Sequence, residues 1–553
     1  MKKHIILSAI FLSVIINNSF AQNWQWANSA GGANNDRPAS LCQDANGNIY
    51  VTGNVSYPVA YFQTDTFNVS GVNDIYLAKY DANGNELWVK HFGGSYNNWM
   101  NQKSEGGGAV AYNPNTNSIY LSGLFIGTCT IDTFTLSTAP SDKQIFLAKF
   151  DLNGNCIWAK SAGSAGDEGG ATMAITPLGN IYLSGTVKYN ATFDTINTGC
   201  GGYLAMYNES GNCQWVKIIY NGDQNNNFYG SSVSPYSIQL YNSDLFILGY
   251  KVSDSAFVDT ILITNPINYY PLVLARFDSL GNVKWAKHTG GPLPEFGILS
   301  MDNNGNSYFG SKFFGGNAIV DTDTVFATGT SDFFFTKYDQ NGNFKWVRQS
   351  NATLNARAIG TSSDADGNVY LTGSFSGNAT FGTFNVTANT TEDMFIARYD
   401  SSGSCIGIRH AGEGNGTRTL IDGSGSCIIA GYFKNSLTLG ATTLASQGND
   451  DFFIVKTDAI TGIGGRISNP NNQLIIYANP NAGKCNITVP DDFLHEKNLM
   501  LSIYDNTSKL IQQKTLEMND GKIKLNLEAE AKGIYNVTLS NGQKIYYGKI
   551  VFE

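Results

Sequence analysis

Six pentapeptides of the form Asp-x-Asn/Asp-Gly-Asn are the residues of this sequence that most resemble ligands for a metal ion. They begin at Asp44, Asp81, Asp151, Asp302, Asp339 and Asp364. Their oxygen spacing imitates the start of an EF-hand calcium loop, but the bidentate Glu at the twelfth position is missing and strand-like sequence flanks each copy. A Gly or Asn at positive φ and an Asp that bonds its own backbone suit a tight hairpin. We therefore predict turns and no metal site.

No constellation of catalytic residues is found. The chain lacks a G-x-S-x-G elbow, an H-E-x-x-H pair and a P-loop. His91, His288 and His410 occupy equivalent positions of a repeat, which favours a structural role over that of a general base. The Asp–Gly–Trp spacing differs from that of sialidase Asp-boxes, and there is no adjacent cysteine pair of the quinoprotein kind. We predict no enzyme, no catalytic residue and no cofactor. The alternative is an extracellular propeller enzyme, quinoprotein-like or polysaccharide-degrading.

Two strand-like elements recur seven times along the chain. One resembles "NIYVTG" (48–53) and the other "IYLAKYD" (75–81). The alternation of β-branched and aromatic residues, with a period of about 60 residues, indicates one four-stranded unit that repeats. The second element ends at positions 81, 151, 208, 278, 339, 400 and 458.

The fourth strand of the units carries a tryptophan. The sixth slot holds Gly407, and the copy that the seventh unit needs stands at the N-terminus, where "WANSAGG" (26–32) matches "WVKHFGG" (88–94). A first strand that completes the last sheet closes a ring and removes an exposed sheet edge. We predict an all-β protein, a seven-bladed β-propeller closed by an N-terminal strand and followed by a small C-terminal antiparallel β-sandwich. The tryptophans predicted to pack between blades are Trp26, Trp88, Trp158, Trp215, Trp285 and Trp346.

The Y-x-x-G, D-x-F-x-x-K-Y-D and G-N-x-x-W elements resemble the SBBP-type bacterial β-propeller repeat. The resemblance covers nearly all of residues 26–458. It implies the propeller fold and secretion, and it implies no particular reaction.

Composition points to an exported protein. Two lysines precede an apolar run from Ile5 to Ile16 and small residues precede Ala21, so residues 1–21 are predicted to be a secretory signal peptide. That run is too short to span a membrane and no other long apolar run follows. A net charge of −9 without a basic stripe argues against nucleic acid. Eight cysteines leave buried free thiols and one or two disulfides equally open.

The C-terminal region differs from the repeats. We predict a propeller over 22–463, a linker over 464–473 and a separate sandwich over 474–553, in which three segments resemble the type A sorting domain of the type IX secretion system of Bacteroidetes. Ala478 and Ser508 depart from that pattern. The resemblance implies export across the outer membrane and contact with the type IX machinery. The matching residues are Asn479, Pro480, Gly483, Tyr504, Asp505, Gly533, Ile534, Tyr535 and Lys549.

The connections between units vary in length, and variable loops on a rigid scaffold are where recognition usually occurs. Loops 91–108 and 218–237 carry aromatic and amide side chains suited to sugar or peptide contact, although they could equally pack on their own blades. Arginines before the first strand of three neighbouring units are predicted to face Glu105, Glu168 and Glu295 across a polarised channel mouth. The predicted ligand contacts are Tyr96, Asn98, Trp99, Tyr220, Phe228, Tyr229, Arg37, Arg357 and Arg418.

These features predict a monomeric, secreted or surface-attached, non-catalytic propeller that binds a glycan or a protein through its variable-loop face. The sequence does not name the ligand.

Overall fold

The computed structural model describes residues 24–94, 106–139, 142–221, 233–251, 255–264, 272–289, 295–460, 474–490, 493–494, 496, 498–505, 510–516, 521–541 and 545–553. In these ranges the chain forms strands and no α-helix, so the all-β prediction is confirmed. Within the same ranges, no helix has the length and apolar character needed to cross a bilayer. The predicted signal peptide and linker lie outside the described residues, and the predicted domain boundaries stay predictions.

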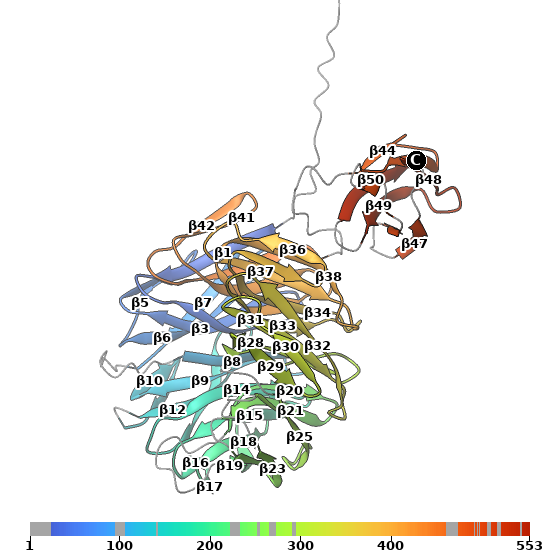
Figure 1. Ribbon diagram of the computed structural model, residues 1–553. Helices are drawn as coiled ribbons and strands as arrows, with labels where there is room; N and C mark the ends of the chain where they lie inside the picture. The colour runs from blue at the N-terminus through green and yellow to red at the C-terminus, as the bar shows by residue number, and fades with distance from the viewer. Residues whose placement is uncertain are drawn as a thin grey trace, which may run out of the picture.

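The repeat region consists of successive antiparallel sheets, each with the strand order a-b-c-d. Figure 1 shows them following one another round the body in chain order, from blue through green to orange, in a propeller-like arrangement. The four strand positions are as follows. Strand a is β2 (Arg37–Gln43), β8 (Gly106–Asn113), β14 (Gly169–Ile175), β20 (Val233–Tyr241), β27 (Ser300–Met301, preceded by β26, Glu295–Phe296), β33 (Ala356–Ser363) and β39 (Asn415–Ile421). Strand b is β3 (Ile49–Ser56), β9 (Ser118–Ile126), β15 (Ile181–Val187), β21 (Asp244–Lys251), β28 (Ser307–Phe314), β34 (Val369–Phe375) and β40 (Cys427–Phe433).

The two outer positions complete each sheet. Strand c is β6 (Asn73–Tyr80), β12 (Lys143–Phe150), β18 (Gly201–Tyr207), β24 (Leu272–Phe277), β31 (Ser331–Tyr338), β37 (Asp393–Tyr399) and β43 (Asp451–Thr457). Strand d is β7 (Glu86–Phe92), β13 (Cys156–Gly163), β19 (Cys213–Asn221), β25 (Val283–Thr289), β32 (Phe344–Ala352), β38 (Cys405–Glu413) and, for the last sheet, β1 (Trp24–Gly32). Strands b and c are buried almost throughout, because neighbouring sheets cover both of their faces.

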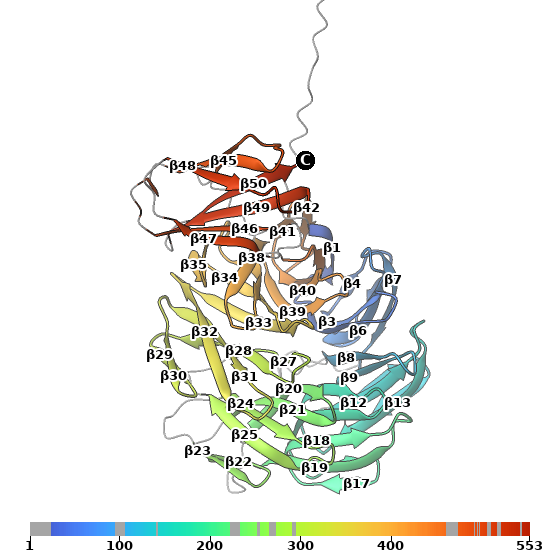
Figure 2. The same ribbon diagram turned by 90° about the vertical axis from the view of Figure 1, so that its right-hand side faces the viewer.

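The N-terminal strand completes the last sheet. β1 runs antiparallel to β43, with Trp24 opposite Thr457 and Ala30 opposite Phe452. Both views place β1 beside the orange strands of the last unit (Figure 1; Figure 2). The pairing covers the free edge that β43 would otherwise present to solvent.

Short β-hairpins occupy the connections between strands b and c. Several extend the sheet of the preceding unit, as where β4 pairs with β1 and β16 pairs with β13. These hairpins were not predicted from the sequence, and they make the connections within the units part of the scaffold. The hairpins are β4 (Val59–Tyr61) and β5 (Thr66–Asn68), β10 (Thr128–Ile131) and β11 (Phe134–Ser137), β16 (Ala191–Phe193) and β17 (Ile196–Thr198), β22 (Ser255–Val258) and β23 (Ile261–Thr264), β29 (Asn317–Val320) and β30 (Asp323–Phe326), β35 (Asn378–Phe381) and β36 (Phe384–Thr387), and β41 (Ser436–Leu439) and β42 (Thr442–Ala445).

The acidic pentapeptides form tight turns, as their sequence predicts. In the turn that begins at Asp81, one carboxylate oxygen accepts hydrogen bonds from the backbone N–H groups of Asn83 and Asn85, both at 2.8 Å. The other oxygen accepts from the side-chain amide of Asn85 at 2.8 Å. These hydrogen bonds to the charged form lower the pKa of Asp81, against the opposing effect of its partial burial. The carboxylate is therefore committed to its own turn.

The strand-d tryptophans lie against the c–d turn of the following unit. The indole of Trp158 covers Gly211, where an added Cβ would approach the ring to 2.9 Å, and its Nε1 donates to the carbonyl of Glu209 at 3.3 Å. Gly211 also has a φ of 77°, a left-handed conformation that favours glycine. The same arrangement joins Trp26 to the turn at Gly84. The turn and the tryptophan therefore form one interface between units.

The slot occupied by Gly407 faces a unit that has no c–d turn, because its strand d comes from the N-terminus. Here Arg409 replaces the indole. Its guanidinium donates to the carbonyl of Asp458 at 2.9 Å and to that of Ala459 at 3.2 Å, beyond the end of β43. Gln25 of β1 donates to the side chain of Asp458 at 2.7 Å from the other side.

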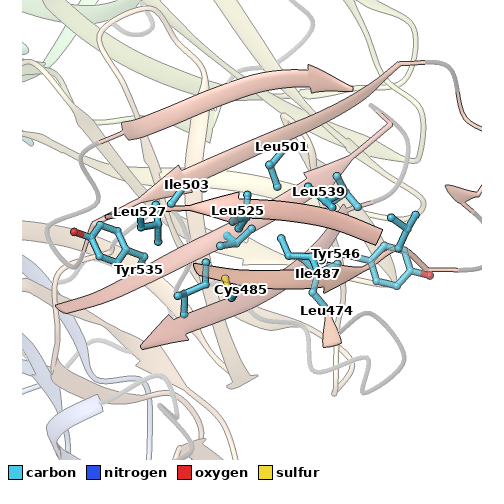
Figure 3. Packing of buried hydrophobic residues seen from close by; sticks show 14 of the residues in the cluster. Leu474, Cys485, Ile487, Leu501, Ile503, Leu525, Leu527, Tyr535, Leu539 and Tyr546 are labelled. Carbon is cyan, nitrogen blue, oxygen red and sulfur yellow. The ribbon is translucent and has the colours of Figure 1, made fainter. Parts of the chain in front are cut away.

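The C-terminal residues form a three-stranded and a four-stranded antiparallel sheet. Leu501, Ile503 and Leu539 of the larger sheet share a buried cluster with Ile487 and Leu525 of the smaller one, as Figure 3 shows. This core contains no residue of the repeats. The strands are β44 (Ile475–Tyr477), β45 (Lys484–Thr488) and β48 (Lys522–Asn526), and then β47 (Leu510–Leu516), β46 (Leu499–Tyr504), β49 (Gly533–Ser540) and β50 (Ile545–Phe552).

All eight cysteines are described and all are free thiols. Three of them, Cys156, Cys213 and Cys405, begin strand d and direct Sγ toward the carbonyl oxygen two residues further on. Burial raises the pKa of each of these thiols to about 12, so that they stay protonated and unreactive at neutral pH. Of the two alternatives left open by the sequence, the structure contains free thiols.

We predict that Trp158→Ala lowers the free energy of unfolding by about 2–3 kcal/mol, below the cost of deleting a fully buried Trp, because this indole is half-buried. Denaturant unfolding measures the loss. Leu178→Ala, at a side chain that is 81% exposed, is the control and should leave stability unchanged. Equal stability of wild type and Trp158→Ala would show that the turn does not depend on the indole.

Candidate functional site

The strand-a positions surround a cavity on the axis of the repeat region. Strands β2, β8, β14 and β20 contact one another in sequence, β27, β33 and β39 continue the series, and β39 returns to β2. All of these strands contribute lining residues to the cavity, whose volume is about 670 Å³. Among the described residues that line the cavity, most are apolar or carry hydroxyl or amide groups, and Arg418 is the one charged side chain. A cavity of this size is typical of sites for small ligands.

Arg37 and Arg357 meet at a third residue, Tyr432, which sequence reasoning missed. The guanidinium carbon of Arg37 lies 4.3 Å from the centroid of the Tyr432 ring. Arg357 donates from Nη2 to the hydroxyl of the same tyrosine at 3.1 Å. We call Arg37, Arg357 and Tyr432 the mouth cluster. The predicted convergence of these two arginines is therefore present in the structure.

Both arginines of the mouth cluster have acidic partners. Arg37 donates from Nε to Asp450 at 3.1 Å, although its side chain is still 47% exposed. Arg357 lies 3.6 Å from Glu392 and donates to Ser374 at 3.0 Å. Their charges are thus partly neutralised, and the cluster presents a guanidinium stacked on an aromatic ring rather than a free positive field.

The expected acidic side of the mouth is not formed by Glu168. This residue is 1% exposed, and its carboxylate accepts hydrogen bonds from the backbone N–H groups of Ser164 at 2.6 Å and Lys188 at 3.0 Å. Burial raises the pKa of Glu168. Glu168 therefore fixes two backbone segments and does not reach the mouth. Glu105 lies outside the described residues.

Arg418 lies deeper than the other two arginines. Arg37 pairs with Asn54 and Arg357 with Ser374, and the equivalent residue of the last unit is Asn415, which pairs with Tyr432. Arg418 is therefore not equivalent to Arg37 and Arg357: every one of these strands has a β-bulge at this place, the two other arginines precede it, and Arg418 follows it and lines the cavity.

The remaining predicted ligand contacts do not join this cluster. Tyr220 is fully buried in the core, with its ring 6.4 Å from that of Phe277, a location that does not support contact with an external ligand. The others, Tyr96, Asn98, Trp99, Phe228 and Tyr229, lie outside the described residues.

A buried pair of carboxylates lies beside the mouth cluster. Asp36 and Asp451 are 0% and 1% exposed, and a Cβ added at Gly31 would collide with both carboxylates. Asp36 accepts from the N–H groups of Gly32 and Ser56, each at 2.6 Å. Burial, opposed by those bonds and reinforced by the charge of Asp451, raises the pKa of Asp36 to about 7. Burial likewise raises the pKa of Asp451 to about 6.

The predicted sorting residues come together in the C-terminal sheets. The amide of Asn479 donates to the carbonyl of Lys549 at 2.6 Å, and its oxygen accepts from the N–H of Val551 at 2.7 Å. Tyr535 is buried in the core of Figure 3, and its hydroxyl donates to the carbonyl of Ala531. Asn479 therefore ties the first of the three segments to the last.

Comparison with known families assigns this C-terminal part. The family described as "Secretion system C-terminal sorting domain" matches residues 475–553. The sorting tail directs export by the type IX secretion system to the cell surface or the extracellular space, and it implies interaction with the type IX machinery.

Other proteins show weaker similarity to this chain. An uncharacterized WD repeat-containing protein of Acanthamoeba polyphaga mimivirus is 21% identical over 518 residues, which cover 74% of this chain and 36% of the viral protein. The chain thus spans about a third of the length of that relative. Similar solved structures include the endosialidase of phage phi92 (8% identity, 95% of this chain and 87% of that one, TM-score 0.35). An apocarotenoid oxygenase of Synechocystis (11%, 80% and 95%, TM-score 0.35) and a DUF4221 protein of Bacteroides vulgatus (11%, 63% and 91%, TM-score 0.29) are also similar.

We predict that Asp36→Asn changes how stability depends on pH. Because the pKa of Asp36 is about 7 in the folded chain and about 4 when unfolded, folding takes up a proton between these values. The wild type should lose this contribution as the pH rises from about 4 through 7, whereas the Asn variant should not. Melting temperatures of both proteins from pH 4 to 8 should therefore diverge in favour of the variant as pH rises.

Asp339→Asn is the matched control, because burial, the largest single effect, is outweighed by the hydrogen bonds that the carboxylate accepts from Asn343, Lys345 and Asn341, which together lower the pKa of Asp339 to about 2. Asp339→Asn should lower the melting temperature across the whole of this pH range. The difference from the wild type should shrink only in stronger acid. A pH-independent difference between wild type and Asp36→Asn would contradict the raised pKa.

Proposed function

We propose that the repeat region is a closed seven-bladed β-propeller of the SBBP type, that the C-terminal sheets form a sandwich, and that the exported protein binds a glycan or an extracellular protein with its loop face without catalysing a reaction. The cyclic series of strand-a contacts and the pairing of β1 with β43 support the closed ring. The cluster shared by the two C-terminal sheets supports the sandwich.

The mouth cluster is the observation that carries the binding proposal. Its residues come from units that are distant in sequence, since Arg37 follows the first strand of the chain and Tyr432 belongs to the last unit. The half-exposed guanidinium of Arg37 offers N–H donors, and the Tyr432 ring beneath it offers an apolar face. Donors placed on an aromatic surface suit sugar hydroxyls and peptide groups.

The chemistry of the cluster suits binding better than catalysis. A general acid or base must present a titrating group to the reacting atoms. Here Asp450 is buried under Arg37, and Glu392 is held by Arg357 and by the hydroxyl of Ser374 at 2.5 Å. Both carboxylates are thus used to fix the arginines, which leaves the guanidinium groups and the tyrosine ring as the groups that a ligand can touch.

We predict that the double variant Arg37→Gln/Arg357→Gln loses most of its ligand binding and keeps its fold. The measurement is binding of the purified protein to an array of neutral and acidic oligosaccharides, with capture of surface proteins as a second arm. Both contacts to Tyr432 disappear in this variant, so binding should fall at least tenfold on every positive spot.

Arg348→Gln provides a control at an arginine on another interface, where the side chain donates to the carbonyls of Ser402 and Gly403. It should bind as the wild type does. Unchanged binding by the double variant would remove the mouth cluster as the site. Turnover of any bound sugar, detected as released product, would contradict the non-catalytic proposal.

A further inference from the structure

Arg418 stands in a ring of small side chains at one level of the axial cavity. In each unit that contributes to this ring, one strand-a residue pairs with the strand-b residue that precedes the repeated glycine. Arg418 holds this position in the last unit, where it pairs with Ala430 before Gly431. Its equivalents in the other units are Ser40, Ala109, Thr172, Ser237 and Gly360. No long side chain competes with the arginine at this level in these units, so the cavity is wide where the guanidinium lies.

The guanidinium has no acidic partner among the described residues. Its Nε donates to the carbonyl of Ala39 and its Nη1 to that of Thr417 at 2.8 Å, which leaves Nη2 without a hydrogen-bond partner in the described chain. This contrasts with Arg37 and Arg357, which both have carboxylate partners. Burial lowers the pKa of Arg418 to about 10, so the group still carries its charge at neutral pH. An enclosed charge without a counter-ion is costly unless something pairs with it.

Neutral polar groups lie in the same sector of the wall. Ser300, Ser362 and Thr419 belong to the fifth, sixth and seventh units, which are neighbours, and all three line the cavity. Their hydroxyl oxygens are buried and have no hydrogen-bond partner in the described chain, and Ser300 is only 6% exposed. Buried hydroxyl groups in native proteins normally have a partner. The sector therefore combines one positive charge with several hydroxyl groups that can donate or accept.

We propose that the axial cavity binds a small hydroxylated organic carboxylate of the uronic acid class, with its carboxylate on Nη2 of Arg418 and its hydroxyl groups along the wall formed by β27, β33 and β39. A single guanidinium, with no other charged side chain among the described lining residues, matches an anion of one negative charge. The hydroxyl and amide lining matches a ligand rich in hydroxyl groups. A volume of about 670 Å³ accommodates a monosaccharide or disaccharide and excludes a folded protein segment.

Titration calorimetry with glucuronate, galacturonate and glucose tests the proposal on the full chain at low ionic strength. We expect the wild type to bind at least one of the two uronates and to bind glucose at least tenfold more weakly. Arg418→Gln should lose at least tenfold in uronate affinity. Arg418→Lys keeps a positive charge but not the planar donor group, so its uronate affinity should lie between those of the wild type and Arg418→Gln.

Lys188→Gln removes an exposed positive charge outside the cavity lining and should bind uronate as the wild type does. Three results would overturn the proposal: no uronate binding by the wild type, equal affinity for glucose and glucuronate, or unchanged affinity in Arg418→Gln. Tighter binding of chloride or inorganic phosphate than of either uronate would also overturn it, since the ligand class would then be wrong. If Arg418→Gln does not fold, the comparison of uronate with glucose on the wild type and the Arg418→Lys affinity still decide the matter.

The proposal uses residues other than the mouth cluster, so the two tests separate. Loss of array binding in Arg37→Gln/Arg357→Gln with intact uronate binding would support both sites independently. Uronate binding that depends on Arg37 and Arg357 but not on Arg418 would overturn the proposed site in the axial cavity and would support the mouth cluster as the binding site.

Discussion

The contact on which the repeat region depends is a tryptophan ring laid on the glycine of the neighbouring turn. Each partner needs the other's local structure: the turn needs a residue at positive φ, and the indole needs a surface without a Cβ. In the turn that begins at Asp81, the aspartate accepts hydrogen bonds from the turn backbone, and the indole N–H of Trp26 donates to the carbonyl of Ala82. One local motif thereby fixes the angle between successive sheets, and the repetition of that angle brings the chain round to its beginning.

The position of Gly407 lacks this contact for a structural reason. The unit that is closed by β1 has no c–d turn, so a tryptophan at the position of Gly407 would have no glycine on which to lie. Arg409 reaches the carbonyls beyond β43 instead, and Gln25 approaches the same end from β1. Side-chain hydrogen bonds from two strands thus replace a stacked ring. A glycine that breaks the repeat in sequence is therefore a consequence of where the ring is closed.

The sequence predicted the parts of the structure that repeat. The turns, the strand order, the location of the closing strand and the sorting residues follow from local patterns such as Asp81–Asn85 and from the displaced copy at Trp26. The hairpins between strands b and c were missed, although Asp132 and Asp194, both with φ near 55°, occupy the Asp-Thr turns that signal them.

The mouth cluster could be predicted only in part. The arginines were visible in the sequence, but Tyr432 and the carboxylate partners depend on the ring bringing the first and last units together. The sequence also placed Arg418 beside Arg37, although the strand pairing shows that Arg37 lies one residue before the position of Gly416 and Arg418 two residues after it, a register that only the paired strands reveal.

β1 and β43 lie at opposite ends of the repeat region, so their pairing also determines when this region reaches its native structure. Trp24 finds Thr457 only after the whole repeat region has been made, and contacts between residues so distant in sequence form slowly because their loop entropy must be lost first. Until then the last sheet presents the edge of β43, whose apolar residues would invite pairing with another chain. The mouth cluster shares this dependence, since Arg37 and Tyr432 meet across the same closure. A chain whose ring is open therefore lacks both its protected edge and its candidate binding surface, so folding of the repeat region and formation of the mouth are one event.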